Sequence, residues 1–225
     1  MIVFDDVSKK YAATKFALQD VNLTISDGEF VFLVGSSGAG KTTMLRLVIR
    51  EIIPSKGSVF VNEWEVNKLK PQMIPFLRRT VGFVFQDFKL LLDRTVAENI
   101  GVSLEILGKS KKESDKRIGE VLEVIKLEGK SNYFPKQLSF GEQQRVAIGR
   151  AIAGETKILL ADEPTGNLDP KTSWEILKII DKINKSGTSV VMATHNVDIV
   201  DSMKKRVIEV SDGKIIRDEK KSKYS

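Results

Sequence analysis

Gly35-Ser36-Ser37-Gly38-Ala39-Gly40-Lys41-Thr42 is the stretch of sequence that decides the fold. It satisfies the pattern G-x-x-x-x-G-K-[ST] at every position, with the apolar run Phe30–Val34 before it and a helical pattern, Lys41–Arg50, after it. Glycines in such a loop let backbone N–H groups close around phosphates, and the helix N-terminus adds partial positive charge. We therefore predict a phosphate-binding loop; a plain Gly-rich turn is the weaker alternative. Lys41 would reach the β- and γ-phosphates of a nucleotide, and Thr42 would offer its hydroxyl to Mg²⁺.

Two adjacent carboxylates follow a second apolar strand. The run Ile158–Ala161 leads directly into Asp162 and Glu163. The pair is weak evidence alone, because turns favour Asp, but the carboxyl ends of parallel strands share one edge of a sheet. We therefore expect both carboxylates near the phosphate loop. Asp162 would hold Mg²⁺, directly or through water, and Glu163 would polarise an attacking water.

The only histidine, His195, stands at a third strand end, after the apolar run Val190–Ala193 and Thr194. A lone histidine is more often structural than catalytic. Its position at the same expected sheet edge is where a sensor of the γ-phosphate would lie.

A fourth feature spans Leu138-Ser139-Phe140-Gly141-Glu142-Gln143-Gln144-Arg145. Ser139 can cap a helix that starts near Phe140, with Glu142 at the third helical position. The plain interpretation is a helix start. The functional interpretation uses the same feature, because a capped helix N-terminus attracts anions.

Composition excludes several classes of protein. A chain of 225 residues, 41% hydrophobic, is long enough for one α/β domain with an inserted lobe. It has no cysteine and one histidine, so disulfides, a thiol nucleophile and a multi-histidine metal site are excluded. Its +6 charge comes from interleaved Lys, Arg, Asp and Glu, which favours a solvated surface over a nucleic-acid or lipid site. No apolar run approaches the ~18 residues of a membrane span and no secretory signal opens the chain, so we expect a cytoplasmic protein.

The order of the elements predicts an α/β fold with a mostly parallel sheet. We expect strands at 21–25, 30–34, 81–85, 157–161 and 189–193, hairpins at 58–66 and around 212–213, and helices at 41–50, 95–107, 118–125 and 171–185. We divide the chain into a nucleotide-binding α/β core (1–86 and 156–217), a helical subdomain (87–155) and a basic tail (218–225).

These motifs, in this order, resemble the ATP-binding cassette (ABC) family, whose members hydrolyse ATP as subunits of membrane complexes. The resemblance covers nearly the whole chain. It implies a P-loop ATPase fold with a mainly parallel core sheet, an N-terminal antiparallel β subdomain and an inserted helical subdomain. It also implies these roles: Tyr11 stacking on adenine, Gln86 contacting Mg²⁺ and the membrane partner, Ser139-Phe140-Gly141-Glu142 as the signature loop, Asp169 in the D-loop, and His195 as the switch histidine.

The same resemblance implies an ATP-dependent head-to-tail homodimer. Each ATP, with Mg²⁺, would lie between the Gly35–Thr43 loop of one chain and the signature loop of the other. A second helix N-terminus closing on the γ-phosphate would exclude water. Phe140 departs from the family pattern, which has glycine there, so a bulky side chain stands where backbone approaches phosphate.

Residues 83–99 resemble the cell-division branch of the family, on Gln86-Asp87-Phe88 followed by Asp93-Arg94-Thr95-Val96. That branch implies a polytopic membrane partner, a peripheral location on the inner face of the membrane, and a role in regulating cell-wall hydrolysis. The apolar stretch Phe88–Leu92 would line the groove for this partner; a buried loop is the plain alternative. An ATPase of a lipoprotein-release or macrolide-type exporter is the runner-up. A DNA-binding ATPase is disfavoured because no coiled coil separates Lys41 from Ser139.

Overall fold

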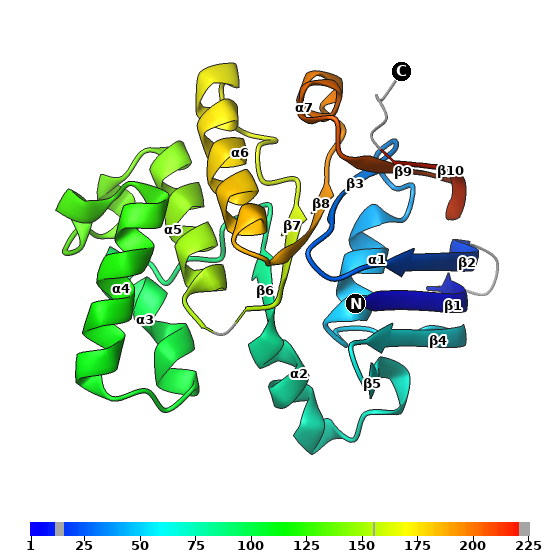
Figure 1. Ribbon diagram of the computed structural model, residues 1–225, viewed down its shortest axis with the longest axis horizontal. Coiled ribbons are helices and arrows are strands. Elements are labelled where there is room, and N and C mark those ends of the chain that lie inside the picture. The colour runs from blue at the N-terminus through cyan, green and yellow to red at the C-terminus, as the bar shows by residue number, and fades with distance from the viewer. Residues whose placement is uncertain (12–15, 155, 221–225) are drawn as a thin grey trace. The chain divides into compact units, whose positions relative to one another are not determined.

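A computed structural model describes residues 1–11, 16–154 and 156–220. The chain divides into a first unit, Met1–Arg78 together with the chain from Ser189 onward, and a second unit, Arg79–Thr188. Figure 1 labels the helices and strands of both units.

The first unit contains two groups of strands. Its elements are β1 (Ile2–Lys10), β2 (Phe16–Ile25), β3 (Phe30–Val34), α1 (Lys41–Val48), β4 (Lys56–Val61), β5 (Trp64–Glu65), β8 (Ser189–Ala193), α7 (Val197–Met203), β9 (Arg206–Ser211) and β10 (Lys214–Glu219). One sheet has the order β2-β1-β4-β5 and is antiparallel. The other group has the order β10-β9-β3-β8, in which β3 runs parallel to both neighbours and β10 is antiparallel to β9.

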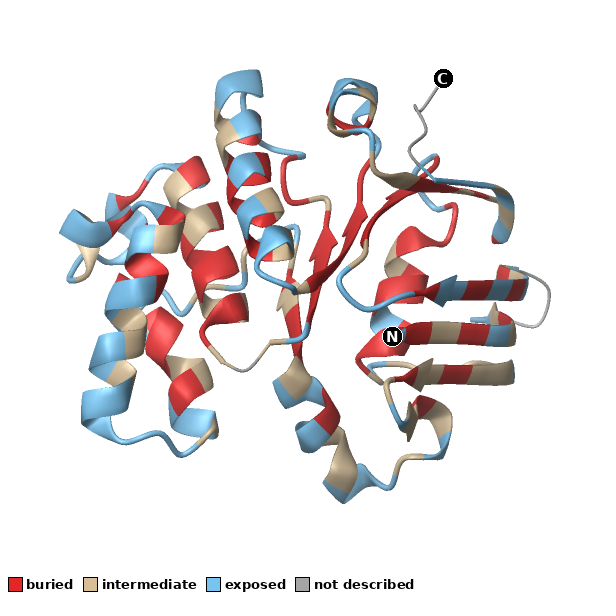
Figure 2. Cartoon of the chain, in the orientation of Figure 1, coloured by how far each residue is buried: buried red, intermediate tan, exposed pale blue. Residues whose placement is uncertain are grey.

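Burial explains why these segments are strands. All five residues of β3 and of β8 are buried, as expected for parallel strands covered on both faces (Figure 2). In β2 the buried residues Val21, Leu23 and Ile25 alternate with exposed ones, because only one face of this strand meets the core. Helix α1 packs against β2 and β4 through that face.

The second unit pairs a short parallel sheet with helices. Its elements are β6 (Val81–Val84), α3 (Val96–Ile106), α4 (Lys111–Ile125), α5 (Phe140–Ile152), β7 (Ile158–Asp162) and α6 (Pro170–Lys185), and α2 (Ile74–Thr80) leads into it from the first unit. Strands β6 and β7 are parallel neighbours. Helix α5 packs against α3, α4, α6 and β6 and is the centre of this unit (Figure 1).

The close packing of α5 depends on Gly149. A Cβ there would lie 2.9 Å from Ile125 Cδ1 and 3.1 Å from Val121 Cγ1, both on α4. The same two residues belong to the apolar face predicted for the helix at 118–125, so that prediction is confirmed.

Most of the predicted elements are confirmed, and the strands at 30–34 and 189–193 agree to the residue. The seven-residue helices α2 and α7 were not predicted, because each is too short to show a helical period. The division at residues 87 and 155 stays a prediction. Of the expected basic tail, 218–219 end β10 and 221–225 lie outside the described residues.

Candidate functional site

The phosphate loop connects β3 to α1 and is already folded around the ammonium group of Lys41. Lys41 is 6% exposed, and its Nζ donates to the carbonyl oxygens of Gly35 at 2.7 Å and Ser36 at 3.0 Å. Gly40 precedes α1 with a φ of 118°, a left-handed conformation that favours glycine. The three residues at the loop crest, Ser36, Ser37 and Gly38, are exposed, whereas Ala39 and Gly40 are buried. A positive charge is therefore held beneath an exposed backbone loop at a helix N-terminus, the arrangement that binds phosphate.

Thr42 and Thr43 open helix α1 directly after the lysine. Thr42 is half-buried and Thr43 is 9% exposed. The Tyr11 hydroxyl lies 3.5 Å from Thr43 Oγ1, while Tyr11 as a whole is 60% exposed. A largely exposed tyrosine, with the Lys9 ammonium over its ring at 5.4 Å, thus lies beside the helix that begins in the phosphate loop. This place is compatible with the stacking role expected of Tyr11.

His195 follows β8, the parallel neighbour of β3. Leu33 pairs with Ala193 in the ladder, and the Thr194 N–H donates to the Leu33 carbonyl at 3.0 Å. Gly35 and His195 therefore stand beyond the carboxyl ends of adjacent strands, and His195 is exposed. The first unit brings together the phosphate loop, Tyr11 and His195.

The predicted carboxylates occupy the carboxyl end of β7 in the second unit. Asp162 ends the strand and is 8% exposed, and Glu163 follows with a φ of 50°. A left-handed backbone is uncommon for glutamate and is typical of residues that a surrounding structure holds in place for function. Gln86 lies two residues beyond β6, whose Val84 pairs with Ala161, so Gln86 and Asp162 mark adjacent strand ends.

Two residues that the sequence analysis did not single out hold the loop after Gln86. Arg150 on α5 donates to the carbonyls of Phe88 at 2.8 Å and Lys89 at 2.6 Å. Burial lowers the pKa of the Arg150 guanidinium below its ordinary value. Asn99 on α3 is fully buried and bonds the backbone of Leu91, accepting from its N–H at 2.9 Å and donating to its carbonyl at 3.0 Å. The sequence did offer a signal for Asn99, because it is a polar residue on the apolar face of the helix expected at 95–107. A buried amide needs hydrogen-bond partners.

Phe88 itself is held in an uncommon conformation. Both Phe88 and Lys89 have positive φ, 59° and 50°, where a bulky residue is an outlier. The Phe88 ring lies 6.2 Å from the ring of Phe140, centroid to centroid. The loop that follows Gln86 and the signature loop therefore meet through two aromatic side chains.

The signature loop forms the capped start of α5, as the sequence predicts. Ser139 Oγ accepts from the Glu142 N–H at 3.3 Å, and Glu142 Oε2 accepts from the Ser139 N–H at 3.0 Å. A second Glu142 oxygen pairs with Lys130, and this contact with the Lys130 ammonium holds the pKa of the Glu142 carboxyl below its usual range. Phe140 is 66% exposed at the first helical position, so an aromatic side chain stands outward beside the cap.

Asp169 lies close to the signature loop, at the N-cap of α6. Its carboxylate accepts from the Thr172 N–H at 3.0 Å and pairs with the Thr172 hydroxyl, and this hydroxyl holds the pKa of Asp169 below its usual value. Thr172 in turn touches Gly141. The second unit thus brings together the carboxylate pair with Gln86, and the signature loop with Asp169.

Within the described residues no group of three or more His, Cys, Asp or Glu side chains could form a protein metal cage. Nor does any described helix have the length and apolar character needed to cross a membrane.

Comparisons with known proteins place these features in a family. The family model described as ABC transporter matches residues 18–166. The chain is 50% identical over 224 residues to the cell division ATP-binding protein FtsE of Bacillus subtilis, covering 100% of this chain and 98% of that protein. It is 43% identical over 213 residues to FtsE of Escherichia coli, with 95% and 96% covered. A dimeric post-hydrolysis state of an ATP-binding cassette bound to ADP and Pi superimposes with a TM-score of 0.90 at 37% identity and full coverage of both chains.

The chain belongs to the ABC transporter family and is an ATP-hydrolysing cassette with the P-loop α/β fold of that family. Within the family it belongs with the cell-division ATP-binding proteins of the FtsE type. The predictions of the fold, of ATP hydrolysis and of the cell-division branch are confirmed.

Proposed function

We propose that this FtsE-like ATPase works as a head-to-tail homodimer on an FtsX-like polytopic membrane protein, at the cytoplasmic face of the cell membrane. ATP cycling in the pair would regulate cell-wall hydrolysis during division. The observation that carries the nucleotide site is the folded phosphate loop, with the Lys41 ammonium donating to the Gly35 and Ser36 carbonyls. A bound triphosphate would offer this ammonium better acceptors than two neutral carbonyls.

The side chains present fit ATP with Mg²⁺. Magnesium is usually bound through one or two protein oxygens together with substrate phosphates, so no carboxylate cage is needed. Thr42, Asp162 and Gln86 supply an hydroxyl, a carboxylate and an amide oxygen, which are hard-oxygen ligands of the required kind. When bound, the ion would neutralise developing charge on the β- and γ-phosphates.

The ATP site of one chain would comprise the whole phosphate loop with Tyr11 and Gln86. The loop residues are Gly35, Ser36, Ser37, Gly38, Ala39, Gly40, Lys41, Thr42 and Thr43. Backbone N–H groups of the loop would bind the phosphates, and the exposed Tyr11 ring would stack on the base.

Hydrolysis would be an in-line transfer of the γ-phosphoryl group to water. The water oxygen forms a bond to the γ-phosphorus, and the bond from that phosphorus to the β–γ bridging oxygen breaks. Glu163 would orient the water through a hydrogen bond and take up the proton that the water loses as its oxygen bonds to phosphorus. Lys41 would stabilise charge on the leaving ADP, and His195 would contact the γ-phosphate. The left-handed backbone of Glu163 supports this role.

The second chain would complete the site. Ser139 and Gly141 of the partner would present the capped N-terminus of α5 to the γ-phosphate, with Asp169 near the same contact. Phe140 leaves the α5 cap intact, which supports phosphate binding in trans despite the missing glycine.

The membrane partner would dock on Phe88–Leu92. Leu91 is 41% and Leu92 is 57% exposed, and Arg150 and Asn99 hold the backbone of this stretch in place. Exposed apolar side chains on a fixed backbone are typical of a binding surface.

Affinity capture tests the biological role. Glu163→Gln, loaded with ATP, would be recovered from detergent-solubilised native membranes and its partner identified. Recovery of an FtsX-like membrane protein supports the proposal. Recovery of a lipoprotein-release or exporter permease keeps the catalytic assignments and overturns the cell-division role. Recovery of no membrane protein overturns the membrane complex.

A further inference from the structure

The turn between β9 and β10 is bonded to the phosphate loop. The Gly213 N–H donates to the carbonyl oxygen of Ala39 at 2.9 Å. In the sequence, Asp212-Gly213 marks only a hairpin turn, and no role follows from it. The contact joins residues 174 positions apart, but both lie in the first unit.

The peptide group whose carbonyl accepts the hydrogen bond from Gly213 also contains a backbone N–H of the phosphate loop. The Ala39 carbonyl and the Gly40 N–H belong to one planar trans peptide, so they point in opposite directions. A hydrogen bond that fixes the carbonyl toward Gly213 therefore aims the Gly40 N–H away from the hairpin. Gly40 is the residue before Lys41, where backbone N–H groups of such loops face phosphate.

The loop is packed tightly against β2 and β9 as well. A Cβ on Gly40 would lie 2.6 Å from the Ala17 carbonyl oxygen, and one on Gly35 would lie 2.1 Å from the Val210 carbonyl oxygen. Neither residue therefore has room for a side chain, and the loop backbone rests on fixed backbone of β2 and β9.

Gly213 is enclosed in the same way. Its carbonyl accepts from the Gln19 N–H at 2.8 Å, and a Cβ on it would lie 2.8 Å from the Ala17 carbonyl oxygen. Its φ is 77°, a value that any other L-residue adopts only with strain. The turn is therefore hydrogen-bonded on one side to β2 and on the other to Ala39, with no room for a side chain on Gly213.

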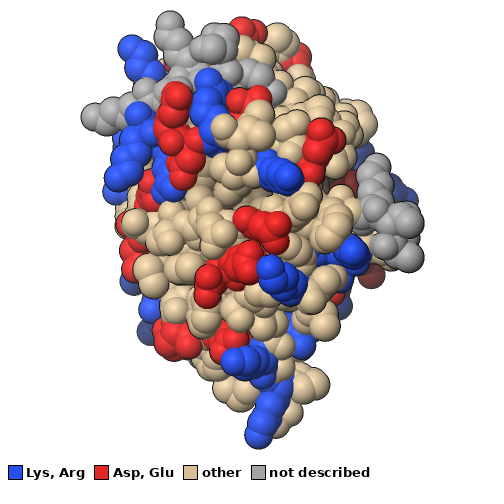
Figure 3. Space-filling model, turned by 90° about the vertical axis from the view of Figure 1, so that its right-hand side faces the viewer, with Lys and Arg blue, Asp and Glu red and all other residues tan. Residues whose placement is uncertain are grey.

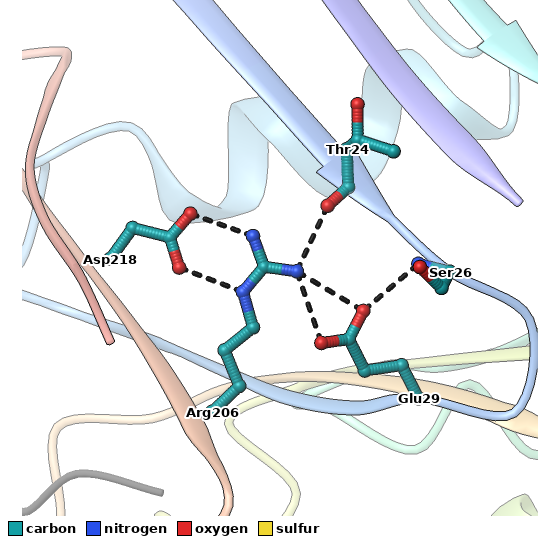
Figure 4. Close-up of polar contacts among 5 residues, drawn as sticks. All are labelled: Thr24, Ser26, Glu29, Arg206 and Asp218. Carbon is teal, nitrogen blue, oxygen red and sulfur yellow. Dashed lines mark hydrogen bonds and ion pairs between the residues drawn. The ribbon is translucent and has the colours of Figure 1, made fainter. Parts of the chain in front are cut away.

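Arg206 holds the other end of this hairpin (Figure 4). Its guanidinium pairs with both oxygens of Asp218 on β10, at 2.7 and 2.6 Å, and donates to Glu29 at 3.0 Å and to the Thr24 carbonyl of β2 at 2.9 Å. The Arg206 side chain is 12% exposed, and the Asp218 carboxylate raises its pKa above the ordinary value. A bidentate pair of this kind, with the arginine largely buried, fixes geometry as well as charge. The hairpin is thus anchored to β2 at both ends.

We propose that Gly213 is a positioning residue of the ATP site, which sets the orientation of the Ala39–Gly40 peptide and so the N–H that the loop presents to phosphate. The proposal rests on the nucleotide site proposed above and adds a determinant outside the loop motif. Arg206 supports it by fixing the hairpin that carries Gly213.

The test compares two glycine substitutions with similar backbone strain. Gly213→Ala adds a methyl group against the Ala17 carbonyl, whereas Gly108→Ala, at a φ of 70°, meets nothing within 4 Å. The dissociation constant for Mg·ADP and the KM and kcat for ATP are measured at a temperature where circular dichroism shows every variant fully folded. Gly213→Ala is expected to raise the ADP dissociation constant and the ATP KM about tenfold, with kcat within about twofold, as for one weakened hydrogen bond to a charged group. Gly108→Ala is expected to leave all three within about twofold.

A Gly213→Ala protein that is folded and binds ADP like the wild type overturns the proposal. If Gly213→Ala does not fold, Arg206→Lys decides, because lysine cannot reproduce the bidentate pair. A threefold or larger rise in the ADP dissociation constant of Arg206→Lys supports the proposal, and an unchanged constant overturns it. Wild-type and Lys41→Ala proteins are run in parallel. If they bind ADP equally, the proposed nucleotide site itself is wrong, which is a separate outcome.

Discussion

Gly141 of the signature loop and Thr172 of α6 lie so close that a Cβ on the glycine would stand 2.3 Å from Thr172 Cγ2. Thr172 also bonds Asp169 through its hydroxyl and its N–H. The start of α5 and the start of α6 are thus closely packed, with Thr172 between Gly141 and Asp169.

This fit predicts a pair of substitutions in which the second repairs the first. Gly141→Ala should destabilise the protein by about 1–3 kcal/mol, the usual cost of an overpacked contact, although alanine favours helix. Adding Thr172→Ser removes Cγ2 and keeps the hydroxyl that bonds Asp169, and the next nearest Thr172 atom lies 3.7 Å from the new Cβ. The double variant should therefore recover most of the loss, measured by urea unfolding. The matched control is Gly119→Ala in α4, where nothing lies within 4 Å, and it should be neutral or stabilising. A Gly141→Ala protein as stable as Gly119→Ala would refute the contact.

The helix caps of the second unit predict acid sensitivity. The Thr95 N–H lowers the pKa of Glu98, and the Ser110 hydroxyl lowers the pKa of Glu113, below the ordinary value of 4.5. Because these pKa values are lower in the folded chain, the caps contribute stability above about pH 4.5 and lose it as pH falls through the folded values. Glu98→Gln with Glu113→Gln keeps both capping boxes without a titrating group.

The double glutamine variant should therefore show a smaller drop in urea midpoint between pH 6 and pH 4 than the wild type. Glu123→Gln, which removes an exposed carboxylate outside the caps, serves as the control and should behave as the wild type. An equal drop in the urea midpoint of all three proteins would show that the helix caps do not cause the acid sensitivity.

A charge at Phe88 should separate membrane docking from nucleotide binding. Phe88→Glu places a carboxylate in the apolar stretch at residues 88–92 and should abolish recovery of the membrane partner. The ADP dissociation constant should stay within about twofold of wild type. Ile106→Glu, at a residue 57% exposed on α3 outside this stretch, is the control and should retain the partner. Parallel loss of nucleotide binding and of the partner in Phe88→Glu would contradict the docking surface.

Short sequence patterns predicted those elements that depend on residues close together in the chain. The strand at 30–34 follows from an unbroken apolar run, and the α5 cap follows from Ser139 and Glu142 at the spacing of a capping box. Both are set by residues within a few positions of one another, so the sequence carried the necessary information.

Features that depend on distant contacts were not predictable in this way. Two hydrogen bonds join residues more than sixty positions apart: Gly213 donates to the Ala39 carbonyl, and Arg150 donates to the Phe88 carbonyl. The positive φ of Phe88 has no local signal, because phenylalanine disfavours it and only the folded surroundings hold it. The phosphate loop motif predicted the nucleotide site, but the contacts of that loop with Gly213 became visible only in the fold.

Turnover of ATP by Glu163→Gln decides whether this chain hydrolyses ATP with Glu163 at the reacting phosphate. Phosphate release would be measured at saturating Mg·ATP for the wild type and for Glu163→Gln, with ATP binding measured on the same preparations. We expect a rate at least about 100-fold lower in Glu163→Gln, with ATP affinity retained and the chain sedimenting as a dimer when ATP is present. Phosphate release by Glu163→Gln at a rate close to that of the wild type would contradict a role for Glu163 in hydrolysis.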